Sequence, residues 1–141
     1  MMLLKDFIAY VVMQIGGAIF GCIVANIIFK LPPVTISTLV RHDFSQFLSE
    51  ILATFGLILV IFIGSEVSKQ NIPVLVGSYI TSAYWFTSST SFANPAVTVA
   101  RQFSDTFTGI SPSGVPTFII AQIFGAILGF VVIQWLTNQV I

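Results

Sequence analysis

Apolar residues dominate four long stretches of the chain, and short polar connectors separate these stretches. A helix rises 1.5 Å per residue, so about 20 apolar residues cross a hydrocarbon core of about 30 Å. Backbone polar groups in hydrocarbon must bond within their own segment, which favours helices over open strands. The pattern therefore predicts a single membrane domain whose spanning helices cover residues 7–29, 44–64, 72–92 and 116–136.

A fifth apolar segment, residues 94–103, is too short to cross a bilayer. It opens with Asn94 and Pro95. Asn is favoured at a helix N-cap, and Pro is tolerated at the first helical position. A short helix between two spans is typical of a re-entrant segment. The predicted fold class is an all-α membrane protein with about four transmembrane helices and one re-entrant half-helix.

The composition supports this fold class. Of the 141 residues, 56% are hydrophobic and 7% are charged, and the mean hydropathy is +1.01. Soluble domains carry roughly a quarter charged residues, so this chain cannot cover a water-facing surface. We therefore predict an integral, multi-pass protein of the cell membrane that is surrounded by the lipid bilayer.

Charge and residue counts argue against several function classes. The net charge is zero and the sequence has no basic cluster, so nucleic acid is not an expected partner. Cys22 and His42 are the single cysteine and histidine, so the sequence predicts neither a disulfide nor a metal site. It contains no nucleophile–base pair and no phosphate-binding glycine loop. We expect no enzyme activity and no cofactor.

One short sequence occurs twice. Residues 14–21 (QIGGAIFG) match residues 122–129 (QIFGAILG) at six of eight positions, 108 residues further along the chain. Both copies place glycines four residues apart, a spacing that lets helix backbones approach closely in membranes. A pattern repeated in the first and last spans indicates a duplicated channel or transporter ancestor.

Residues 78–109 resemble the fifth helix and second pore loop of the aquaporin (major intrinsic protein) family, with the loop sequence NPAVTVAR typical of bacterial members. Glu50 with Thr54 and Phe55 resembles the start of that family's fourth helix. The spans that carry the repeated motif are similar to its third and sixth helices. The resemblance implies a partial aquaporin-like fold in which the family's first two helices and front pore loop are missing.

Asn94, Pro95 and Ala96 are the predicted pore motif. A half-helix that begins at Asn94 directs free N–H groups and its positive dipole end toward its own start. Near the bilayer midplane this field repels cations, while a neutral solute still accepts a hydrogen bond from the Asn94 amide. The alternative is an ordinary N-cap at the membrane surface. The family resemblance favours the pore motif.

The resemblance also implies a selectivity constriction formed by Ser82, Ser91 and Val97. The position of Val97 is commonly arginine in water-selective members, so an uncharged constriction here is expected to tolerate glycerol-like solutes. Arg101 lies one helical turn after Val97 on the same stripe and is predicted to guard the pore mouth. An ion pair with Asp105, four residues on, is an equal and compatible alternative.

Glu50 is the only charge deep inside a predicted span, which makes it a functional candidate. A proton relay needs further ionisable groups along the path, and the spans offer none. The family resemblance instead implies a structural anchor, in which the carboxylate accepts hydrogen bonds from backbone N–H groups of the pore loop.

The predicted function is therefore a channel segment for passive passage of water or small neutral solutes such as glycerol. A homo-oligomer or a separate front-half polypeptide is the expected partner. The alternative is a truncated or split-gene membrane protein, which is inert alone or acts as a helical partner in a membrane assembly.

Overall fold

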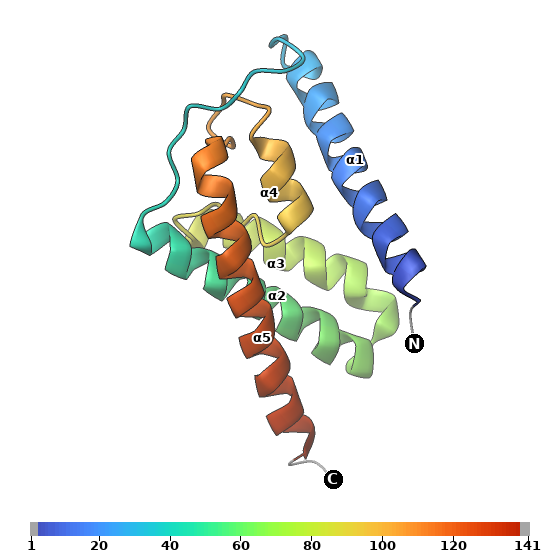
Figure 1. Ribbon diagram of the computed structural model, residues 1–141. Helices are drawn as coiled ribbons and strands as arrows, with labels where there is room; N and C mark the ends of the chain where they lie inside the picture. Colours follow the sequence, from blue (N-terminus) through green and yellow to red (C-terminus); the bar gives the residue numbers. More distant parts are fainter. Residues whose placement is uncertain (1–2, 139–141) are drawn as a thin grey trace. The chain divides into compact units, whose positions relative to one another are not determined.

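The structure is a computed structural model that describes residues 3–138. These residues form helices and connecting segments without any β-strand, so the prediction of an all-helical fold is confirmed. The helices are α1 (Leu4–Ile28), α2 (Phe44–Val67), α3 (Ile72–Phe86), α4 (Pro95–Arg101) and α5 (Val115–Asn138), with single 3₁₀ turns η1 (Lys69–Asn71) and η2 (Pro112–Gly114) (Figure 1).

Three helical segments within the described residues are long and apolar enough to cross a membrane. They are Leu4–Ile28, Phe44–Val67 and Pro112–Asn138, which correspond to the first, second and fourth predicted spans. Each has 24 or more residues, against the roughly 20 that a bilayer requires.

The third predicted span, residues 72–92, is wrong in its last part, because α3 ends at Phe86. Its 15 residues extend about 22 Å at 1.5 Å per residue, short of the about 30 Å hydrocarbon core. The physical reason lies in Thr87, whose backbone N–H and hydroxyl both bond to the carbonyl oxygen of Ala83. The hydroxyl-rich residues that follow leave the helix.

The chain forms two compact units. Unit 1 contains Met1–Arg41 with Asn94–Pro116, and unit 2 contains His42–Ala93 with Thr117–Ile141. Each unit therefore combines an early and a late segment of the sequence.

In unit 1, α4 packs beside α1 (Figure 1). The connector after α1 runs extended along the segment that follows α4, where the backbone N–H groups of Thr35 and Ser37 donate to the carbonyls of Phe103 and Gln102. Arg41, which belongs to this polar connector, is 4% exposed. The connector is thus partly buried within unit 1.

In unit 2, α2 and α3 lie side by side (Figure 1). α5 packs on α2 through two glycines of the repeated motif. A Cβ atom added at Gly125 would collide with the carbonyl oxygen of Ile51, and one added at Gly129 would lie 2.9 Å from the Cβ of Ile58. These glycines allow the close helix approach that their spacing predicts.

Candidate functional site

Glu50 is the centre of the most extensive side-chain hydrogen-bond cluster of unit 2. It lies on α2 and is 0% exposed. Its Oε1 accepts from the Ser89 hydroxyl and the Phe92 backbone N–H, both at 2.8 Å. Its Oε2 accepts from the Ala93 N–H at 2.9 Å and from Gln122 Nε2 at 2.8 Å. Four donors thus surround one buried carboxylate, as a charge in an apolar environment requires.

The segment that Glu50 holds has an unusual backbone. Thr90, Ser91 and Ala93 adopt left-handed φ angles of 61°, 48° and 47°. Left-handed conformations cost non-glycine residues roughly 1–2 kcal/mol each, so such a segment needs external support. The Ser89 hydroxyl, itself bonded to Glu50, also accepts from the Ser91 N–H at 3.2 Å. The carboxylate therefore fixes a strained loop directly before Asn94.

Asn94 begins the short helix, as predicted. Its Oδ1 accepts a hydrogen bond from the Ala96 N–H at 2.8 Å, and Pro95 occupies the first helical position. The cap leaves the Nδ2 amide group of Asn94 to donate elsewhere. α4 ends at Arg101, two residues before the predicted end of the 94–103 half-helix. The backbone turns there, and the Phe103 N–H bonds to the carbonyl of Ala100.

Val97 and Arg101 line one cavity of about 280 Å³ in unit 1. Water occupies roughly 30 Å³ per molecule in the liquid, so several molecules fit. α1 contributes four of the other lining residues, Ala18, Cys22, Ala25 and Asn26. The segment from α4 onward contributes three more, Ala100, Ser104 and Thr108. The structure thus brings together two of the four residues proposed for the selectivity region.

The other two selectivity candidates belong to unit 2. Ser82 is exposed on α3 and its hydroxyl donates to the Ser78 carbonyl. Ser91 is buried in the loop that Glu50 holds. Because these serines belong to unit 2 and Val97 belongs to unit 1, a four-residue constriction stays a prediction.

Asp105 connects two segments of unit 1. Its carboxylate accepts hydrogen bonds from the Thr38 N–H at 2.8 Å and from the Thr38 hydroxyl at 3.1 Å. Asp105 therefore ties the loop after α4 to the connector after α1. Arg101 remains a lining residue of the cavity.

Two buried polar residues that the sequence analysis did not single out hold the loop after α4. Asn26 is 4% exposed, and its Nδ2 donates to the carbonyls of Pro33 and Phe103, both at 3.1 Å. Its Oδ1 accepts from the Ser104 hydroxyl. An amide near the end of a mainly apolar span was the available signal, although the same span also contains Gln14.

Arg41 is the second of these residues. Its Nε donates to the Gly109 carbonyl at 2.8 Å, and its Nη2 donates to the Phe107 carbonyl at 2.6 Å. Its position in a polar connector gave no indication of burial. The residue acts as a donor to backbone carbonyls rather than as a surface charge.

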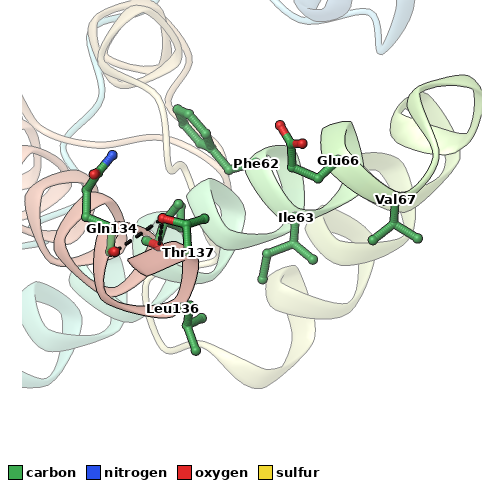
Figure 2. Close-up of a pocket in the computed structure, with 8 residues that line it drawn as sticks. Phe62, Ile63, Glu66, Val67, Gln134, Leu136 and Thr137 are labelled. Carbon is green, nitrogen blue, oxygen red and sulfur yellow. Dashed lines mark hydrogen bonds between the residues drawn. The ribbon is translucent and has the colours of Figure 1, made fainter. Parts of the chain in front are cut away.

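Unit 2 contains a larger cavity of about 690 Å³ where α2 and α5 end, and it holds none of the predicted site residues. Figure 2 shows Phe62, Glu66 and Val67 from α2 opposite Gln134 and Thr137 from α5. Its walls are mainly apolar. Among residues 3–138, no three His, Cys, Asp or Glu side chains gather in a way that could hold a metal ion.

The all-helical fold and its three candidate spans are those of an integral membrane protein. The chain is 48% identical over 132 residues to aquaglyceroporin AqpS of Rhizobium meliloti (strain 1021). The match covers 94% of this chain and 57% of that relative. No known family model matches the chain, and no solved structure matches it.

The chain is therefore a partial homologue of an aquaporin, and the similarity is with channels rather than with enzymes. It spans just over half the length of this relative.

Proposed function

We propose that this chain forms part of a passive channel of the cell membrane for water or small neutral solutes such as glycerol. The observation that carries the proposal is the Glu50 cluster, which fixes the backbone of Phe92 and Ala93 directly before the Asn94-Pro95-Ala96 motif. The similarity to a protein named an aquaglyceroporin supports the solute class.

The residues of α4 have distinct roles in this proposal. The Asn94 amide donates a hydrogen bond to a passing hydroxyl or water oxygen. Val97 supplies an uncharged wall, which admits solutes larger than water. Arg101 places a positive charge in the same cavity wall, which repels cations and hydronium. Glu50 accepts four hydrogen bonds and anchors the loop before α4 in this proposal.

A second candidate function is that of a helical component in a larger membrane assembly. It is favoured by one observation, namely that the chain spans 57% of its relative's length. In that case a complete pore requires further helices from outside this sequence.

Osmotic shrinkage of lipid vesicles tests the proposal and separates the two candidates. We expect vesicles with this chain and the unmatched part of aquaglyceroporin AqpS to shrink faster than protein-free vesicles while a pH gradient persists. The chain with the Glu50→Leu substitution is the matched control and is expected to show no increase. Rapid collapse of the pH gradient contradicts a passive neutral-solute channel.

The chain alone provides the comparison between candidates. Shrinkage at the protein-free rate favours the component of a larger assembly. Robust water flux from the chain alone favours a self-assembled pore.

A further inference from the structure

The cavity of about 690 Å³ where α2 and α5 end has apolar walls. All of its lining residues belong to unit 2, so these walls do not depend on where unit 1 lies. Ligand pockets commonly measure about 300–1,000 Å³, so a ligand of many atoms fits. Five of the eight lining side chains are apolar, namely Phe62, Ile63, Val67, Ile133 and Leu136. Such walls favour an apolar ligand over water.

The three remaining lining residues, Glu66, Gln134 and Thr137, supply hydrogen-bond acceptors. The Thr137 hydroxyl lies within hydrogen-bond distance of the carbonyls of Ile133 and Gln134, at 3.0 and 3.2 Å (Figure 2). Its proton is therefore donated to its own helix, and its oxygen is left to accept. A carboxylate such as that of Glu66 has acceptors only. A ligand group with several donors and no acceptor matches this part of the wall, and an ammonium group has that pattern.

The charge of the cavity wall also favours a cation. Glu66 is the one charged residue among the lining residues. Neither α2 nor α5 has a basic residue in its last turn, where the helix dipole places negative charge. Lys69 follows Glu66 by three residues, but within residues 3–138 no ion pair joins the two side chains. A cationic group is therefore the complementary ligand for Glu66.

The cavity lies at the end of two candidate membrane spans. These spans, Phe44–Val67 and Pro112–Asn138, are 24 and 27 residues long, against the about 20 that cross a hydrocarbon core. Their last turns are therefore expected near the boundary between the hydrocarbon and the lipid headgroups. At this depth a lipid molecule offers an apolar chain and a charged headgroup together.

We propose that this cavity binds a membrane phospholipid with a primary-ammonium headgroup, phosphatidylethanolamine. One acyl chain lies against Phe62, Ile63 and Leu136, and the ammonium group donates hydrogen bonds to the Glu66 carboxylate and the Thr137 hydroxyl oxygen. The site uses none of the residues to which the proposed channel function assigns a role.

Two other phospholipid headgroups fit this wall less well. Phosphatidylglycerol has a net negative charge, which the Glu66 carboxylate repels. The trimethylammonium group of phosphatidylcholine is positive but has no N–H group to donate. Hydrogen bonds between ionised groups are stronger than those between neutral groups, so the primary ammonium has the advantage.

Native mass spectrometry of the full chain in detergent tests the site. The chain is mixed with equal amounts of phosphatidylethanolamine, phosphatidylcholine and phosphatidylglycerol that have identical acyl chains, and each bound lipid is quantified. We expect bound phosphatidylethanolamine to exceed each of the other lipids roughly tenfold, equivalent to about 1.4 kcal/mol. Equal binding of the three lipids, a preference for either of the others, or no bound lipid overturns the proposal.

Glu66→Gln removes the charge and keeps the size of the side chain. Bound phosphatidylethanolamine is expected to fall to the level of phosphatidylcholine. Asp43→Asn is the matched control, because it makes the same charge change at an exposed residue that does not line the cavity. It is expected to keep the preference. A preference that survives in Glu66→Gln, or that both variants lose equally, overturns the role of Glu66.

Ile63→Trp tests the apolar part of the cavity. The larger side chain takes up space, so the amounts of all bound lipids should fall while the headgroup preference remains. Leu52→Trp is the size control, at an exposed residue of α2 outside the cavity. Equal amounts of bound lipid in the two variants contradict an acyl chain in the cavity. None of these measurements uses solute flux, so the lipid site can fail while the proposed function holds.

Discussion

The segments before and after α4 are held by opposite chemistry. Before α4, the backbone presents N–H groups, and the Glu50 carboxylate accepts from those of Phe92 and Ala93. After α4, the backbone presents carbonyls, and Asn26 and Arg41 donate to them. An irregular segment inside an apolar protein needs fixed partners of matching polarity. The difference shows that buried acceptors hold the segment before the short helix, whereas buried donors hold the segment after it.

Among these substitutions, removal of the Glu50 carboxylate should lower the free energy of unfolding most. Glu50→Leu removes the carboxylate that accepts from Ser89, Phe92, Ala93 and Gln122. A buried hydrogen bond lost in this way costs about 1–3 kcal/mol. We expect a large loss of unfolding free energy in detergent, measured by denaturant titration. Glu66→Leu on the exposed part of the same helix is the control and should change stability by no more than about 0.5 kcal/mol. Equal effects of the two substitutions would show that the Glu50 cluster does not stabilise the loop.

The conservative change at the same position sharpens this prediction. Glu50→Gln keeps one acceptor oxygen, so part of the cluster survives. Its loss of unfolding free energy should lie between those of the unchanged chain and Glu50→Leu. A Gln variant as unstable as the Leu variant would assign the effect to charge rather than to acceptor number.

Removal of the guanidinium should have the next largest effect. Arg41→Met leaves the carbonyls of Phe107 and Gly109 without this donor. Hydrogen bonds to charged groups contribute about 1.5–3 kcal/mol, and a loss of that size is expected by the same titration. Lys69→Met, at an exposed cation, is the matched control. An Arg41→Met variant with an unchanged free energy of unfolding would contradict the claim that Arg41 holds the segment after α4.

The smallest expected change is an increase in the free energy of unfolding, on Ala93→Gly. Ala93 has a φ of 47°, which glycine adopts without strain. Ala93→Gly should therefore raise the unfolding free energy by up to about 1 kcal/mol, partly offset by the greater freedom of glycine in the unfolded chain. Ala53→Gly in the middle of α2 should instead lower it by roughly 0.5–1 kcal/mol. If both substitutions destabilise equally, the loop backbone is not strained.

The sequence predicts the parts of this architecture that rest on local chemistry. Long apolar runs predict α1, α2 and α5, and the Asn-Pro pair predicts the start of α4. A lone carboxylate in a span identifies Glu50. The end of α3 is missed because Thr87 and the residues after it are too weakly polar to interrupt an apolar stretch.

Asn26 and Arg41 are missed for a different reason. Their partners lie 77 and 68 residues away in the sequence, so no local pattern predicts the contacts. Arg41 in particular has the sequence surroundings of a surface charge, and only tertiary packing buries it. Hydrogen bonds to backbone carbonyls that lie far away in the sequence thus cannot be predicted from local sequence patterns.

The most direct test of the central claim is the ratio of glycerol to water permeability with Val97→Arg. The measurement uses stopped-flow light scattering on vesicles that contain the chain and the unmatched part of aquaglyceroporin AqpS, with Val97→Leu as the uncharged size control. If α4 lines the solute path, the added guanidinium narrows the path and adds charge to its wall. The ratio of glycerol to water permeability should then fall by at least about tenfold, the lower end of the discrimination that small pocket changes produce. An unchanged ratio in Val97→Arg, with water flux intact, would contradict a path along α4.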